Sequence, residues 1–171
     1  MDADALRALQ APLKSKYKDD AAAAVLTLRA TGAIDESKIA CKVETGRAIA
    51  EAGLHPLTGG TGAELCSGDM LLEALVACAG VTLKAVSTAL GIDLRSGRVT
   101  AEGDLDFRGT LGVAKDAPVG FAAIRLRFDL QTGAPEEQIA QLIKLTERYC
   151  VVFQTLKQSP ASTVSVTTTP A

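Results

Sequence analysis

Two cysteines far apart in the chain stand where thiol chemistry could take place. Cys78 lies in the middle of an almost wholly apolar stretch with helical spacing, LLEALVACAGVTLKAV at residues 71–86, and Cys150 ends another helical segment, LTERYC. A thiolate is a strong nucleophile, and two thiols that meet inside a fold can alternate between reduced and disulfide forms. A buried cysteine can also serve only as a small apolar side chain, so both interpretations stay open at this point.

The other cysteines and the single histidine give weaker signals. Cys41 shares one face of an expected strand with Ile39 and Val43, which predicts a core position. Cys66 and His55 fall in a stretch rich in glycine and threonine, where we interpret them as a spare thiol and an ordinary loop residue. Because the chain has one histidine and no C-x-x-C pair, we expect no bound metal.

The composition predicts one compact soluble domain, or a subunit of a small oligomer. The 171 residues are 47% hydrophobic and 22% charged, and the 18 basic side chains nearly balance the 20 acidic ones, so we expect no nucleic-acid partner. The N-terminus lacks the continuous apolar core of a secretory signal. The most apolar segment, residues 70–90, is interrupted by Glu73 and Lys84. We therefore expect a cytoplasmic protein without a membrane span, whose thiols are reduced at rest.

The N-terminal region predicts a short helix that is separate from the domain. Residues 3–10 can form an amphipathic helix, and Pro12 ends or kinks it. A charged connection follows. We therefore assign residues 1–21 to this helix and its connection, and residues 22–171 to a single domain.

The domain opens with a predicted pair of strands. Residues 24–32 and 37–45 are β-branched, roughly alternating runs, which indicates an antiparallel pair. Residues 46–53 have a short helical pattern. Residues 54–69 are rich in glycine and threonine and predict a long loop.

The middle of the chain predicts a buried helix and two strands. Residues 70–90 are apolar nearly all round, so we expect a long helix at the centre of the fold or in a subunit interface, ended by Gly91. Residues 93–109 predict a strand with turns at Ser96 and Gly97 and near Arg108. Residues 120–132 alternate most clearly between inward apolar and outward charged side chains: Ile124, Leu126, Phe128 and Leu130 against Arg125, Arg127 and Asp129.

The C-terminal region predicts two helices and a final strand. Pro135 and two glutamates open a helix that extends to about Tyr149, and continued helical spacing would place Cys150 on its core-facing side. A short helix over residues 151–158 and a strand over residues 162–169 complete the chain. Because strands and helices are segregated along the sequence, we expect an α+β domain with an antiparallel sheet.

The two cysteine-centred segments, CSGDMLLEALVACAGVTL at residues 66–83 and LTERYCVVFQTL at residues 145–156, together resemble the OsmC and organic hydroperoxide resistance superfamily of thiol peroxidases. The resemblance extends over residues 22–166. It implies an intertwined homodimer in which antiparallel sheets wrap around long, buried central helices, with active sites near the subunit interface.

The resemblance also implies a mechanism and its participants. The Cys78 thiolate would attack an organic hydroperoxide and become a sulfenic acid, and Cys150 would then condense with it to a disulfide. An external dithiol such as dihydrolipoamide would reduce that disulfide, without a bound cofactor, in defence against oxidative stress.

Charged groups should activate the Cys78 thiol, because an apolar site alone raises a thiol's pKa. The family uses an arginine held by a carboxylate, and the matching residues are Arg47 and Asp69, with Arg148 as the second candidate for the cation. Asp69 stands where the family commonly has glutamate, and a plain N-cap role is an equal alternative for it. Glu73 is set aside because it lies about 140° around the helix from Cys78.

Two other functions remain open. The first is a non-catalytic dimeric module that binds a small apolar ligand or a partner. Two departures from the family are compatible with it: Asp69 in place of glutamate, and Val151 where the family often has proline. A cysteine hydrolase performing acyl transfer would need a base beside the thiol, and His55 is the only histidine available.

Overall fold

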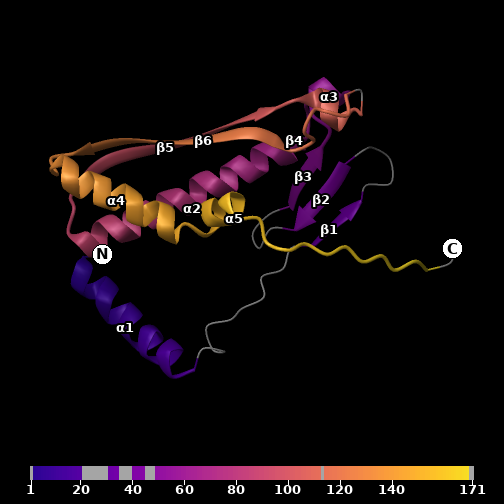
Figure 1. The fold of residues 1–171 in the computed structure, drawn as a ribbon. Coiled ribbons are helices and arrows are strands. Elements are labelled where there is room, and N and C mark those ends of the chain that lie inside the picture. The colour runs from indigo at the N-terminus through magenta and orange to yellow at the C-terminus, as the bar shows by residue number, and fades with distance from the viewer. Residues whose placement is uncertain (1, 21–30, 35–39, 45–48, 113, 170–171) are drawn as a thin grey trace.

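The computed structural model describes residues 2–20, 31–34, 40–44, 49–112 and 114–169. These residues form an α+β fold, which confirms the predicted class. Figure 1 shows a small sheet of four strands at one end of the molecule and a long two-stranded hairpin that lies across two helices. The division of the chain at residue 21 stays a prediction.

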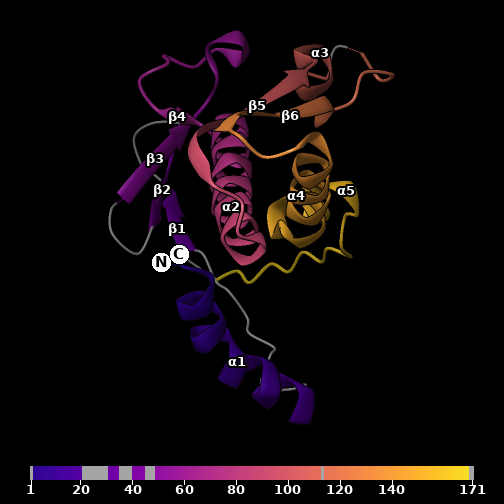
Figure 2. The ribbon, with the colours of Figure 1, turned by 90° about the vertical axis from the view of Figure 1, so that its left-hand side faces the viewer.

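The first helix is longer than the sequence predicts. α1 spans Ala3–Asp19 and continues through Pro12, so the predicted end at this proline is wrong. A proline removes one hydrogen bond from a helix interior, but the lysine-rich segment that follows consists largely of good helix formers. α1 contacts α2 (Ser67–Leu90), and in Figure 2 it lies apart from the two sheets.

The four-stranded sheet has the order β1 (Thr31–Ile34), β2 (Ala40–Glu44), β3 (Ile49–Gly53), β4 (Leu65–Cys66). The predicted antiparallel pair is present as β1 and β2, although most of the predicted first strand lies outside the described residues. Cys41 lies in β2. Its side chain is outside the described part of the structure, so its core position stays a prediction.

The helix predicted over residues 46–53 is wrong where the structure describes it. Residues 49–53 form β3, which pairs antiparallel with β2, while residues 46–48 lie outside the described residues. The segment contains alanine and glutamate, which favour helices, but pairing with a neighbouring strand overrides such local preferences.

The predicted loop before α2 contains two short elements. A 3-10 helix, η2 (Pro56–Thr58), follows His55, and Gly59 ends it with a φ of 92°, a left-handed conformation suited to glycine. β4 then pairs in parallel with β3, so that Gly53 lies opposite Cys66. This pairing fixes the point at which α2 begins.

α2 is the longest helix, with 24 residues, and begins at Ser67, three residues before the predicted start. Leu75, Ala79, Leu83 and Ser87 form its buried stripe with a spacing of four residues. Its other side stays open in the single chain, where Val81 is 73% exposed. By length and hydropathy alone α2 could cross a bilayer, a property that it shares with core helices of soluble proteins.

The hairpin of β5 (Leu94–Leu105) and β6 (Phe121–Thr132) covers α2 and α4 (Glu136–Tyr149). The predicted alternation of β6 is confirmed, because its apolar side chains are half-buried and its charged ones are exposed. The predicted turn at Ser96 and Gly97 is wrong. The strand continues there after a register shift, and a side chain at Gly97 would crowd Leu130.

The predicted C-terminal helices are present. α4 follows Pro135, and α5 (Val151–Lys157) follows after a break at Cys150, whose φ of −73° and ψ of 106° are not helical. α3 (Phe107–Thr110) is a short addition after β5. The strand predicted over residues 162–169 is wrong, since the described tail is extended without a paired strand. β-branched residues need a partner to form a strand.

Candidate functional site

The structure brings Cys78 and Cys150 together. Leu75 and Ala79, on either side of Cys78 in α2, form a buried cluster with Cys150, and the half-buried Cys78 packs against this cluster. Cys150 is 1% exposed, and its side chain is one of the hydrogen-bonding groups that lower the pKa of the Cys78 thiol. Two segments separated by about seventy residues therefore bring their cysteine side chains together in one buried cluster.

The surroundings of Cys78 favour its ionised form. Burial alone raises the pKa of this thiol, but hydrogen bonds outweigh burial and the pKa lies below the usual value for cysteine. The donors are the backbone N–H of Val152, the thiol of Cys150, the backbone N–H of Val151 and the hydroxyl of Thr82. Within the described part of the chain, this ionised thiol is thus supported by neutral donors.

Cys150 has the opposite character. Burial raises the pKa of its thiol, and its hydrogen bond to Cys78 raises that pKa further, while backbone N–H groups of Phe153 and Val152 oppose the rise only in part. Cys78 therefore ionises first, and Cys150 stays protonated and donates to it. The pair combines a nucleophile with a second thiol that can form a disulfide with it.

The break between α4 and α5 supplies the backbone donors. The first N–H groups of a helix have no carbonyl partner within that helix, so those of Val151 and Val152 are available to Cys78. Sequence reasoning noted Val151 only as a departure from proline. Its consequence was missed: valine has a backbone N–H, which proline lacks.

Asp69 lies away from the two thiols. It is exposed in the first turn of α2, nine residues before Cys78, which corresponds to about 13.5 Å along a helix axis. The N-cap role predicted as its alternative is wrong, because Cys66 occupies the N-cap position. A carboxylate in the first turn still suits the positive end of the helix dipole.

Neither candidate cation is among the described groups that shift the pKa of the Cys78 thiol. Arg47 lies outside the described residues. Arg148 is exposed, and its guanidinium lies 5.5 Å from the centre of the Tyr149 ring. Glu73 is exposed on α2, in agreement with its exclusion from the site.

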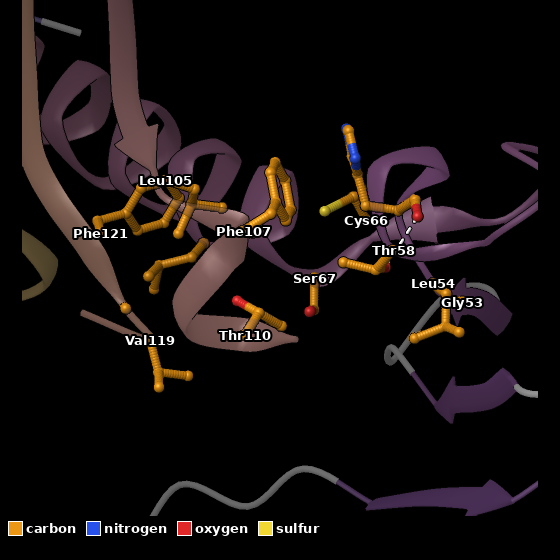
Figure 3. A pocket seen from close by; sticks show the side chains of 14 residues that line it. Gly53, Leu54, Thr58, Cys66, Ser67, Leu105, Phe107, Thr110, Val119 and Phe121 are labelled. Carbon is orange, nitrogen blue, oxygen red and sulfur yellow. Dashed lines mark hydrogen bonds between the residues drawn. The ribbon is translucent and has the colours of Figure 1, made fainter. Parts of the chain in front are cut away.

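A separate cavity of about 380 Å³ lies at the N-terminal end of α2 (Figure 3). Its lining is mostly apolar and includes Leu71, Leu105, Phe107, Val119 and Phe121. Cys66 and His55 also line it, so both belong to a cavity wall, a position that the sequence does not reveal. The His55 ring stacks on Phe107 with centres 4.9 Å apart, and its Nδ1 accepts a hydrogen bond from the Leu57 N–H at 3.1 Å.

The described residues contain no group of three or more histidine, cysteine, aspartate or glutamate side chains able to hold an ion.

Solved structures with the same fold come from several bacteria. An OsmC-like protein from Mycoplasma pneumoniae matches with a TM-score of 0.65 and 16% identity, covering 78% of this chain and 89% of that chain. An organic hydroperoxide resistance protein from Elizabethkingia anophelis, with thiocyanate bound, matches with a TM-score of 0.62 and 18% identity, covering 79% and 91%. An organic hydroperoxide resistance protein named OsmC, from Legionella pneumophila, matches with a TM-score of 0.60 and 15% identity, covering 78% of this chain and 91% of that chain.

The sequence itself matches a protein family as well. No curated protein matches it. The family described as OsmC-like protein matches residues 60–165, which include both Cys78 and Cys150 and form more than half of the 171 residues. The resemblance seen in the two cysteine segments is confirmed, and this chain belongs to the OsmC-like protein family.

Proposed function

We propose that this protein is a cysteine-based thiol peroxidase that reduces organic hydroperoxides in defence against oxidative stress. The observation that carries this proposal is the contact between two unlike thiols, one with a lowered and one with a raised pKa. Two similar structures bear the name organic hydroperoxide resistance protein, which agrees with this substrate class.

In the first step, the Cys78 thiolate attacks one oxygen of the hydroperoxide. The O–O bond breaks, the sulfur takes one oxygen as a sulfenic acid, and the departing alkoxide takes up a proton to become an alcohol. A thiolate is needed because the neutral thiol is a poor nucleophile. The donors around Cys78 favour that thiolate.

In the second step, Cys150 attacks the sulfenic sulfur of Cys78 and water leaves, so that a disulfide joins the two residues. An external dithiol, such as dihydrolipoamide, reduces this disulfide through a mixed disulfide and is itself oxidised. The contact between the two side chains means that the second step needs little movement of the chain.

Arg47 and Asp69 remain candidates for additional activating groups. Asp69 is exposed at the start of α2, where it could hold an arginine, and Arg47 is the family's match for that arginine. The protein would act in the cytoplasm. An intertwined homodimer would cover the open apolar side of α2, on which Val81 is 73% exposed.

A peroxidase assay with cumene hydroperoxide and dihydrolipoamide tests the proposal. We expect the wild-type protein to consume peroxide with multiple turnovers, Cys78→Ser to have no activity above background, and Cys150→Ser to lose turnover with the dithiol. Cys66→Ser is the matched control and should retain activity, since Cys66 lies at the other cavity. Equal consumption by Cys78→Ser and wild type would contradict the proposal.

The second candidate function is a non-catalytic module that binds a small apolar ligand. The cavity of about 380 Å³ beside Leu71 and Phe121 favours this alternative, because its volume and apolar lining suit such a ligand. Saturable binding of an apolar fluorescent probe by a protein without peroxidase activity would support it. The cysteine hydrolase is disfavoured, since His55 stacks on Phe107 and Cys78 receives its hydrogen bonds from other groups.

A further inference from the structure

Thr82 lies one helical turn after Cys78 on α2. Its hydroxyl donates a hydrogen bond of 2.7 Å to the backbone carbonyl oxygen of Cys78, and the side chain is partly buried. Residues four apart lie on the same face of a helix, so the hydroxyl stands next to the Cys78 side chain. The same hydroxyl is among the groups that lower the pKa of the Cys78 thiol.

The hydrogen bond from Thr82 to a backbone carbonyl oxygen is ordinary, but the thiol beside it is unusual. Thr88 makes the same bond to the carbonyl oxygen of Lys84 at 2.8 Å, and Thr146 makes it to that of Leu142 at 2.8 Å. Such bonds are common for threonine in helices. Of these three threonines, only Thr82 bonds to a residue that carries a thiol. The sulfur of Cys78 is therefore a second possible acceptor for its hydroxyl.

A hydroxyl has one hydrogen, so it can donate to only one of these acceptors at a time. While Cys78 is neutral, the carbonyl oxygen is the better acceptor. When Cys78 ionises, a hydrogen bond to the negative sulfur is charge-assisted and is roughly twice as strong as one between neutral groups. Rotation of the hydroxyl about its C–O bond is sufficient to exchange the two.

We propose that Thr82 is a further catalytic residue: its hydroxyl donates to the Cys78 carbonyl oxygen while the thiol is neutral, and turns to donate to the sulfur when the thiolate forms. The hydroxyl thus stabilises the reactive form of Cys78 without moving the backbone of α2. This role rests on the proposed peroxidase function for its purpose, but the hydrogen bond itself does not require a peroxide.

The titration of Cys78 can be followed with few competing groups. β5 and β6 turn apolar side chains toward this cluster, among them Val99, Ala101 and Ile124. In the described part of the chain, no charged side chain is among the groups that shift the pKa of Cys78. α5 contributes Val152 and Phe153, which are also apolar. Among the described groups that shift the pKa of Cys78, the titratable one is Cys150, at the junction of α4 and α5, and its own pKa is raised.

The test measures the rate at which iodoacetamide alkylates Cys78 in the full, reduced protein between pH 5 and pH 10, followed by mass spectrometry of the Cys78 peptide. For Thr82→Val we expect a pH profile displaced upward and alkylation at pH 7 slower by about three- to ten-fold. At high pH its rate should equal or exceed that of wild type, because a more basic thiolate is a better nucleophile.

Three variants keep this test decisive. Thr82→Ser retains the hydroxyl and should restore the wild-type profile. Thr88→Val removes the same kind of helix bond away from the thiols and should leave the profile unchanged. Thr82→Ala removes the hydroxyl without adding a methyl group, and it replaces Thr82→Val if that variant does not fold.

Two results would overturn the role of Thr82. One is a wild-type profile in the variant that lacks the hydroxyl. The other is a rate reduced by the same factor at every pH, which would indicate altered access or structure and no change in ionisation. If the profile shifts as expected while the protein consumes no hydroperoxide, the proposed function fails and the hydrogen bond to the thiolate stands.

Discussion

At the scale of single residues, Cys78 and Cys150 have the same side chain and different reactivity. Burial raises the pKa of both thiols, but hydrogen-bond donors outweigh burial at Cys78 and oppose it only in part at Cys150. The local path of the chain produces this difference, because the break after α4 directs backbone N–H groups of α5 toward Cys78. The nucleophile and its resolving partner are thereby distinguished before any substrate binds.

Replacement of Val151 by proline tests one of these donors. Proline is well tolerated at the first position of a helix and lacks an N–H, so Val151→Pro should remove a single donor while preserving α5. We expect a higher pKa for Cys78 and alkylation at pH 7 slower by about two- to ten-fold. Val151→Ala keeps the N–H and is the control, since the Val151 side chain is 71% exposed. Equal profiles for the proline variant and wild type would show that this donor has no effect.

The two pKa directions also predict the order in which the thiols react. Only the thiolate is alkylated, and Cys78 has the lowered pKa while Cys150 has the raised one. As pH rises from acid, alkylation of Cys78 should therefore increase first and that of Cys150 later. Peroxide consumption should fall as pH decreases through the Cys78 pKa, because the thiol becomes protonated.

Site-resolved mass spectrometry checks this order. In protein unfolded by urea the two cysteines should react at similar rates, because their surroundings are then alike. Faster alkylation of Cys150 than of Cys78 in the folded protein at neutral pH would be incompatible with the assigned roles.

At the scale of elements, α2 connects the reactive thiol to the core. Leu75 is 0% exposed and lies about one turn before Cys78. It belongs to the same buried cluster as Cys150. Opposite it, β5 and β6 provide the apolar floor of that cluster, including Ile124 and Leu126. Packing of α2 against this hairpin and against the C-terminal helices thus holds the two cysteine side chains together.

Truncation of Leu75 measures this packing. Leu75→Ala should reduce the free energy of unfolding by about 2–5 kcal/mol, because it removes a fully buried side chain and leaves a cavity. Leu111→Ala, at a position that is 55% exposed, makes the same change outside the core and should cost much less. Urea unfolding followed by circular dichroism gives both values, and equal losses in the two variants would contradict the assigned core.

Sequence patterns predicted some elements and misjudged others for physical reasons. β6 and α4 were predictable, because strict alternation and Pro135 with its following glutamates are local signals. Residues 49–53 and 162–169 were not, since strand formation depends on a partner that local preference does not reveal.

The same distinction applies to the candidate site. The two cysteine segments were recognised from their motifs, which the sequence displays directly. The backbone N–H of Val151 and the hydroxyl of Thr82 were missed, because a donor of this kind acts only where the chain path brings it to the sulfur. For Thr82, its spacing of four residues from Cys78 in a helical segment was the available signal.

At the scale of the whole molecule, the single chain leaves apolar surface uncovered. Val81 is 73% exposed in the middle of α2, and the extended tail exposes Val164 and Val166. In Figure 1 this tail extends from the body of the molecule beyond α5. Both features fit the proposed homodimer, in which a second chain would cover α2.

A charge on the open side of α2 tests the homodimer. We expect the wild-type protein to sediment with the mass of two chains and Val81→Lys to sediment with the mass of one, because burial of an unpaired lysine in an interface is costly. Val119→Lys places the same charge at a position that is 67% exposed before β6, and should remain dimeric. Analytical ultracentrifugation distinguishes these outcomes, and a wild-type monomer would refute the dimer.

The central claim is that Cys78 and Cys150 react with each other after a hydroperoxide oxidises Cys78. The most direct measurement is peptide mapping by mass spectrometry after one equivalent of cumene hydroperoxide is added to the reduced protein. The account predicts a Cys78–Cys150 linkage, with Cys41 and Cys66 still alkylatable as free thiols. Oxidation confined to Cys41 or Cys66, with Cys78 and Cys150 both remaining reduced, would contradict it.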